Sequence, residues 1–219
     1  MLKKKNRDTY LFFQYLGILL IVSSSICIGC YKLRTLERRK IIEQEKEEFT
    51  KKSNEEMGQD IYDSQTTNSV NEDKDEQKLK SNAIGYIEIK KINIILPIFK
   101  GTSNEILRDG VGVLEEMDTP TDEKNSLSVI AAHRGGYNGE QTFLNIDKLE
   151  KGDKINIITD SKELIYRVID QEVIEKTDWS KFIREEDKSK LILITCYPYP
   201  KNTQRLLVKS ELVEVKMLQ

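Results

Sequence analysis

The chain has 219 residues, of which 35 are Lys or Arg and 37 are Asp or Glu, so its formal net charge is −2 at pH 7. This length allows one ordinary domain with additional segments, and the near-neutral charge argues against a nucleic-acid-binding protein, which normally carries a basic excess or stripe. A single histidine excludes a metal site built from several histidines, and three cysteines are too few for the disulfide framework of a small secreted protein.

The N-terminal region predicts a membrane anchor. Residues 10–31 contain no charged side chain, and as a helix they would span roughly 33 Å, enough for the ~30 Å hydrocarbon core of a bilayer. Basic side chains within residues 1–9 indicate a cytoplasmic N-terminus, although further basic residues follow the span, so the positive-inside rule alone does not fix the orientation.

Two alternatives to an uncleaved anchor are open. A cleaved signal peptide is disfavoured because the apolar run is long and no A-x-A-like site follows it. A lipoprotein signal is suggested by Gly29-Cys30, but Cys27 stands where such motifs usually have leucine. Cys27 and Cys30 lie three positions apart within the span, and small apolar fillers or acylation sites are the expected roles.

Residues 32–82 predict a charged stalk between the anchor and a folded domain. Residues 34–52 are rich in helix-forming side chains and in opposite charges at i,i+4 spacing, which favours a solvated helix. Residues 53–81 are polar and lack hydrophobic periodicity, which indicates disorder.

Residues 83–219 change to a β pattern. Apolar or alternating runs predict strands at 84–89, 92–98, 110–114, 127–132, 154–159, 163–173, 191–196 and 205–215. Thr142–Leu149 predicts a short helix. Eight strands in about 135 residues favour a mainly β fold, a closed or nearly closed eight-stranded barrel with short helices.

Two reactive side chains stand out in this domain. Cys196 is its only cysteine, and His133 is the only histidine of the chain. Each ends an apolar strand, and a rigid scaffold commonly positions catalytic groups at such strand exits. Arg205 opens the next strand, and a β-hairpin from Cys196 to Arg205 would bring its guanidinium beside the sulfur. An inert buried thiol and a structural histidine are the alternatives.

The segments around these residues resemble the sortases, cysteine transpeptidases of the Gram-positive cell surface. The similar stretches are AAHRGG around His133, and ILITC followed by YPYPKNTQR. Upstream, IGYIEIKKINIILPIFKGT, DGVGVLEEMDTP and TFLNIDKLEKGD also look like sortase segments, in the right order. The resemblance covers residues 83–215 and is closest to class C, whereas TCYP also looks like class D.

The resemblance implies a catalytic triad of His133, Cys196 and Arg205. It also implies a membrane-anchored enzyme that cleaves an LPxTG-like sorting motif through a thioacyl-enzyme and passes the acyl group to an amine, either a cell-wall precursor or a pilin lysine. Thr195, Leu193 and Ile192 are expected to contact substrate; the usual motif has threonine where this chain has Ile192. The catalytic domain is then expected outside the cell, with surface proteins or pilins as partners and residues 10–31 in the membrane.

Three further interpretations concern regulation and cofactors. Asp60-Ile61-Tyr62 is at best a degenerate version of the lid that many class C sortases carry. No metal or other cofactor is expected. Some sortases bind calcium between loops comparable to two acidic clusters here, residues 115–123 and 185–187, but solvated surface charge is the commoner explanation.

A rival function from a different class is a non-catalytic, membrane-tethered β-barrel that binds a partner at the cell surface. Such a module would keep the barrel but would not require a reactive thiol. The reactivity of Cys196 therefore discriminates between the two functions.

Overall fold

The computed structural model of the chain describes residues 2–56, 82–135 and 142–218. The chain divides into two compact units, Met1–Ile41 and Ile42–Gln219. Most of the predicted disordered segment, and the lid candidate Asp60-Ile61-Tyr62 in full, lie outside the described residues.

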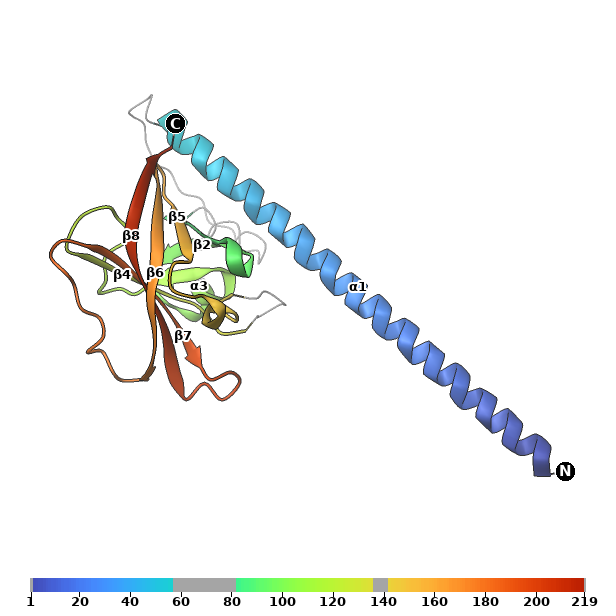
Figure 1. Ribbon diagram of the computed structural model, residues 1–219. Helices are drawn as coiled ribbons and strands as arrows, with labels where there is room; N and C mark the ends of the chain where they lie inside the picture. The colour runs from blue at the N-terminus through green and yellow to red at the C-terminus, as the bar shows by residue number, and fades with distance from the viewer. Residues whose placement is uncertain (1, 57–81, 136–141, 219) are drawn as a thin grey trace. The chain divides into compact units, whose positions relative to one another are not determined.

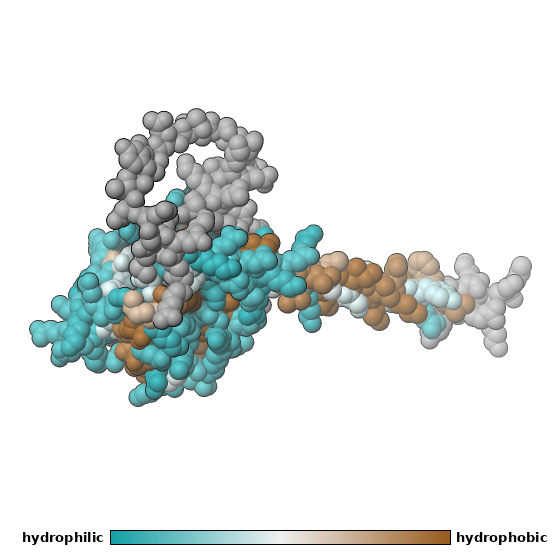
Figure 2. Space-filling view, turned by 90° about the horizontal axis from the view of Figure 1, so that it is seen from above, coloured by the Kyte–Doolittle hydropathy of each residue, from teal (hydrophilic) through white to brown (hydrophobic). Residues whose placement is uncertain are grey.

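The N-terminal unit is helical. Helix α1 spans Leu2–Glu56, so the apolar stretch and the charged stretch that follows it belong to one continuous helix. Its segment Leu11–Lys51 contains a window of mean hydropathy 2.1 with no buried residue, long and apolar enough to cross a membrane. Figure 2 shows hydrophobic residues gathered along this helix. By length and composition this helix is a candidate membrane span, in agreement with the anchor prediction.

The second unit contains a closed eight-stranded β-barrel (Figure 1). Its strands are β1 (Gly85–Ile89), β2 (Ile94–Lys100), β3 (Val111–Val113), β4 (Ser126–Ala131), β5 (Lys154–Ile158), β6 (Lys162–Glu175), β7 (Ser189–Tyr197) and β8 (Gln204–Met217). Around the barrel they follow the order β1-β2-β3-β4-β7-β8-β6-β5, and β5 pairs with β1 to close it. The predicted mainly β barrel with few helices is confirmed.

The barrel interior is filled by aliphatic side chains from every strand. Fully buried examples, from β1, β2, β4, β7 and β8, are Ile87, Ile98, Ile130, Leu193 and Val208. Because the barrel closes on itself, no long strand edge is left open for pairing. The result is a rigid scaffold whose strand ends hold their loops in fixed positions.

Two neighbouring strand pairs determine where the predicted reactive residues lie. Strands β4 and β7 run parallel, with Ala131 opposite Ile194 in the register. Strands β7 and β8 run antiparallel and form a hairpin. The last residues of β4 and β7 and the first residues of β8 therefore meet at one end of the barrel.

The short helical elements differ from the expectation. In place of a helix over Thr142–Leu149, the structure has only the 3₁₀ turn η2 (Ile146–Lys148). Another 3₁₀ turn, η1 (Lys90–Ile92), takes the start of the predicted second strand. Helix α3 (Asn104–Asp109) was not predicted, although Ser103, whose side chain accepts a hydrogen bond from the Ile106 amide, is a typical N-cap signal.

Candidate active site

Cys196 lies near the C-terminal end of β7. The residues before it, Leu191 to Leu193, are buried in the barrel, whereas Cys196 is half-buried. Pro198 follows two positions later and lacks the amide hydrogen needed to extend the ladder. The thiol is therefore held by a buried strand but reaches the barrel end.

Arg205 is the register partner of Cys196 across the β7–β8 hairpin. Side chains directly opposite each other in an antiparallel pair share a face, with Cβ atoms roughly 4.5–5.5 Å apart. The Arg205 guanidinium donates to the Gln204 carbonyl oxygen at 2.9 Å through Nη1. The predicted hairpin is present, and it makes Arg205 the register partner of Cys196; a position of the guanidinium beside the sulfur stays a prediction.

His133 follows the end of β4 on the other side of β7. The Ala132 amide donates to the Ile194 carbonyl oxygen at 3.3 Å, which continues the parallel ladder beyond Ala131. In this register, residues of β4 face those 63 positions later (194 − 131). Two positions beyond Ala131, the same offset would set His133 level with Cys196 (196 − 133). The imidazole-bearing residue thus leaves the barrel at the same level as the thiol.

The main chain at His133 is fixed by three hydrogen bonds. The Thr195 hydroxyl donates to the Ala132 carbonyl oxygen at 2.8 Å, which ties β7 to the residue before the histidine. The His133 carbonyl oxygen accepts from the Phe143 amide at 3.0 Å and from the Thr142 hydroxyl. These bonds tie the residues before the η2 turn to the β4 exit.

The three side chains provide the parts of an acyl-transfer site. A thiol supplies a nucleophile, an imidazole supplies a proton donor and acceptor, and a guanidinium supplies only hydrogen-bond donors because it remains protonated. All three come from the ends of neighbouring strands of one barrel. An arrangement of this kind can form and break an acyl–sulfur bond.

The three residues expected to contact substrate have buried side chains. Leu193 belongs to the main core, and Ile192 packs in a second cluster with Leu127 and Val129. Thr195 is buried and makes the hydrogen bond to Ala132. Their observed contacts shape β7 and its neighbours, and substrate contact stays a prediction.

The acidic clusters are engaged by cations of the chain itself. The Asp118 carboxylate binds the Arg184 guanidinium, which lowers the pKa of Asp118. Asp122 accepts from Lys162 at 2.8 Å. Paired Lys188 and Lys190 lower the pKa of Glu185 to about 2. Within the described parts of the chain, no cluster of three or more His, Cys, Asp or Glu side chains is arranged to hold a metal ion.

Arg134 and Tyr197 are the residues near the site that sequence reasoning did not single out. They directly follow His133 and Cys196, and the Arg134 guanidinium carbon lies 4.9 Å from the centroid of the Tyr197 ring. Their positions next to the two reactive residues were a usable signal. What the sequence lacked was the parallel β4–β7 register that brings the two exits together.

Comparison with known proteins shows what the chain is similar to. The Sortase domain family model matches residues 87–213, more than half of the chain. Sortase D of Bacillus subtilis (strain 168) is 33% identical over 137 residues, covering 61% of this chain and 66% of the relative. The chain therefore spans just under two thirds of that relative's length.

Two solved structures are similar as well. The structure of Clostridium perfringens sortase C with the C-terminal cell wall sorting motif is 43% identical, with a TM-score of 0.57, and the match covers 60% of this chain and 71% of that one. Sortase C1 of Streptococcus agalactiae is 33% identical, with a TM-score of 0.59, over 62% and 69% of the two chains. Both matches are with sortases designated C, in line with the class C resemblance.

Proposed function

The chain belongs to the sortase family, and on that premise we propose that it is a membrane-anchored cysteine transpeptidase that cleaves an LPxTG-like sorting motif. The observation that carries this proposal is the meeting of Cys196, its register partner Arg205 and the strand exit of His133 at one barrel end. The similar C. perfringens structure contains a cell wall sorting motif, which supports the substrate class.

The first half-reaction makes a thioacyl-enzyme. The Cys196 thiolate attacks the carbonyl carbon of the motif threonine, and the carbonyl oxygen gains negative charge in the tetrahedral intermediate. Arg205, across the hairpin, donates hydrogen bonds to this oxygen, because charge that develops in the transition state is stabilised by donors already in place. As the C–N bond breaks, protonated His133 gives its proton to the departing amine.

The second half-reaction transfers the acyl group to an amine. A cell-wall precursor or a pilin lysine attacks the thioester, His133 accepts the proton of the attacking amine, and the Cys196 thiolate leaves as the new amide forms. Ile192, Leu193 and Thr195 would act on the substrate mainly by shaping β7 beneath it, since their side chains are buried.

The proposed location of the chain rests on the apolar segment of helix α1. Its apolar segment would cross the membrane once, with residues 1–9 in the cytoplasm and the barrel outside the cell. Surface proteins or pilins that carry sorting motifs would meet the enzyme there. A catalytic thiol tethered at the membrane surface is close to both its membrane-bound substrates and its wall precursors.

Trapping the acyl-enzyme tests the proposal. The full chain in detergent micelles is incubated with a panel of LPxTG-type peptides without an amine acceptor, and its intact mass is measured. The wild type is expected to gain the mass of the N-terminal acyl fragment on Cys196, and Cys196→Ala to gain none while its circular dichroism is unchanged. A Cys27→Ala/Cys30→Ala variant is the matched control, because it removes two thiols from the anchor and keeps the site.

The kinetic variants have defined expectations. His133→Ala and Arg205→Ala should each reduce acylation by about 10²–10⁴-fold, the range typical of a lost acid–base group. An adduct that persists in Cys196→Ala would contradict the proposal. So would a wild type that no peptide acylates and whose Cys196 is alkylated as slowly as a thiol in the unfolded chain, which is the result expected of the non-catalytic binding module.

A further inference from the structure

Arg134 is a buried charge that the proposed reaction does not use. Its side chain is only 6% exposed, and arginine is almost never buried to this degree without partners. It directly follows His133 in the β4 exit. A buried guanidinium at this position needs a structural or chemical reason.

The contacts of Arg134 connect three separate elements. Nη2 lies 2.9 Å from Asp147 Oδ2 in the η2 turn. The guanidinium also lies over the Tyr197 ring, with Cζ 4.9 Å from the centroid, and Tyr197 directly follows Cys196 on β7. One side chain therefore links the exit that carries the imidazole to the exit that carries the thiol.

The next residue makes the same connection through the main chain. Gly135 has φ +127°, a conformation that side-chain-bearing residues rarely adopt, and a Cβ at this position would lie 3.1 Å from Cε2 of Tyr199. The β4 exit thus packs against the segment after Cys196 twice, through Arg134 on Tyr197 and through Gly135 on Tyr199. Both contacts lie outside the strand ladder that ends at Ala132.

The remaining donors of Arg134 show how much depends on these contacts. Nε and Nη1 are buried and have no hydrogen-bond partner among the residues that the structure describes. Within that part of the chain, the Asp147 carboxylate and the face of the Tyr197 ring compensate the buried charge of Arg134. The guanidinium is consequently held in one place, because moving it away would break both.

From this geometry we propose that Arg134 is a positioning residue, which rests on the proposed function. It fixes the separation between His133 and Cys196 by clamping the β4 exit onto Tyr197. Proton transfer from His133 to the departing amine depends on that separation, and a displacement of about 1 Å costs on the order of 100-fold in rate. Attack by the thiolate on a small, unhindered electrophile involves no proton transfer from histidine, so its rate should depend far less on that separation.

The test compares two reactions of the same thiol. In the full chain in detergent, Arg134→Met is expected to lower kcat for peptide acylation about 10- to 100-fold with KM changed less than about twofold. The alkylation rate of Cys196 by iodoacetamide is expected to change less than about threefold. A loss of structure alone would not slow peptide acylation more than alkylation. The diagnostic readout is therefore the difference between the effects of Arg134→Met on the two rates.

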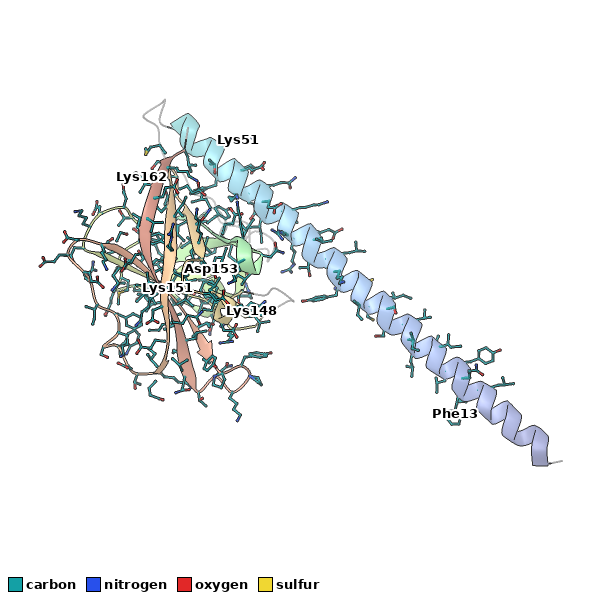
Figure 3. All side chains as sticks on the ribbon, viewed as in Figure 1. Phe13, Lys51, Lys148, Lys151, Asp153 and Lys162 are labelled. Atoms are coloured by element: carbon teal, nitrogen blue, oxygen red, sulfur yellow. The ribbon has the colours of Figure 1, made fainter. Side chains whose placement is uncertain are left out.

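Variants of Tyr197, and of Lys148 as a control, complete the set of experiments. Tyr197→Leu removes the ring and should reproduce the kcat loss of Arg134→Met, whereas Tyr197→Phe keeps the ring and should restore the rate to within about threefold of wild type. Lys148→Met is the control, because Lys148 is an exposed cation of the same η2 turn as Asp147 (Figure 3) and should leave both rates unchanged.

The outcomes separate this inference from the proposed function. If wild type forms the acyl-enzyme but folded Arg134→Met acylates at the wild-type rate, the positioning role is wrong while the proposed function stands. If Arg134→Met does not fold, the Tyr197 pair decides, and equal rates for Tyr197→Leu and Tyr197→Phe overturn the role. A wild type that forms no acyl-enzyme overturns the proposed function itself.

Discussion

Thr195 carries a single hydroxyl whose contact reaches the residue before His133. The side chain is 3% exposed, and its only described hydrogen bond goes to the Ala132 carbonyl oxygen at 2.8 Å. Because β4 and β7 are parallel neighbours, this bond crosses from the strand of the thiol to the strand of the imidazole. The threonine beside the cysteine thus acts on the histidine, in addition to any contact with substrate.

This contact predicts a difference between two conservative variants. Thr195→Val keeps the shape of the side chain but leaves the buried Ala132 carbonyl oxygen without this donor, which costs about 1–3 kcal/mol locally and should loosen the exit before His133. We expect about a tenfold lower rate of peptide acylation. Thr195→Ser retains the hydroxyl and should keep most of the rate. Steady-state kinetics on both variants checks the prediction, and a Thr195→Val enzyme as fast as wild type would contradict it.

The loop between β6 and β7 is joined to a neighbouring loop by an ion pair. Arg184 in this loop donates through Nη2 to Asp118 Oδ1 at 3.0 Å and through Nη1 to the Asn125 carbonyl oxygen at 3.1 Å. Asp118 also accepts from the Leu127 amide at 2.8 Å. The guanidinium therefore fastens the β6–β7 loop to the loop between β3 and β4.

The pairing predicts an acid-sensitive loop that Trp179 can report, because this is the only tryptophan of the chain and lies in the loop. Arg184 holds the pKa of Asp118 below its usual range, so the pair contributes at neutral pH and is lost as pH falls through that lowered pKa. Arg184→Gln should lower the Trp179 fluorescence anisotropy at pH 7, and wild type should reach the same value only in acid.

The exposed Lys176→Gln variant in the same loop is the matched control for this measurement and should behave as wild type. Equal anisotropy in wild type and Arg184→Gln across the pH range would show that the ion pair does not hold the loop. Whether the two acidic clusters, residues 115–123 and 185–187, bind calcium is a separate question. A calorimetric titration of the full chain with Ca²⁺ decides it.

Sequence patterns predicted strands well and loops poorly, for a physical reason. Alternation of apolar residues reports burial on a sheet, which is why the runs ending at Ala132 and Cys196 were located to within one or two residues. The segment at Thr142–Leu149 forms only the 3₁₀ turn η2, and its first two residues are held by hydrogen bonds to the His133 carbonyl oxygen. Such bonds depend on where the barrel places another loop, which local spacing does not encode.

The same distinction applies to the candidate site. The neighbourhood of Cys196 and Arg205 follows from a hairpin of adjacent strands, so local sequence predicted it. The Arg134–Tyr197 contact needs β4 and β7 to be parallel neighbours although the whole of β5 and β6 lies between them in the chain. The resemblance to the sortase family, closest to class C, is confirmed, whereas the triad of His133, Cys196 and Arg205 that it implies stays a prediction.

At the scale of the whole molecule, Tyr166 joins three parts of the barrel in one buried polar network. Its hydroxyl donates to the Thr121 carbonyl oxygen at 3.1 Å and lies 3.2 Å from Ser189 Oγ, which itself donates to Thr121 at 2.6 Å. Strand β6, the start of β7 and the loop before β4 meet at this point. Burial raises the pKa of Tyr166 to about 12.

The raised pKa predicts how barrel stability depends on alkaline pH. The fold favours the neutral phenol, so its contribution is fully present below pH 10, the usual tyrosine pKa, and is lost as pH rises from 10 to about 12. At 1.36 kcal/mol per pKa unit, the loss is on the order of 3 kcal/mol. Tyr166→Phe should be less stable at pH 8, by about 1 kcal/mol for the missing hydrogen bond, but should fall less steeply above pH 10.

Thermal unfolding of the full chain in detergent, followed by circular dichroism from pH 8 to pH 12, measures this difference. Burial raises the pKa of Tyr86 to about 12 as well, so wild type and Tyr166→Phe should both lose stability above pH 10, with the smaller slope in the variant. Tyr199→Phe, which alters an exposed ring, should run parallel to wild type. Parallel curves for wild type and Tyr166→Phe would mean that burial does not raise the pKa of Tyr166, because a phenol whose pKa is higher in the barrel than in the unfolded chain must steepen the loss of stability above pH 10.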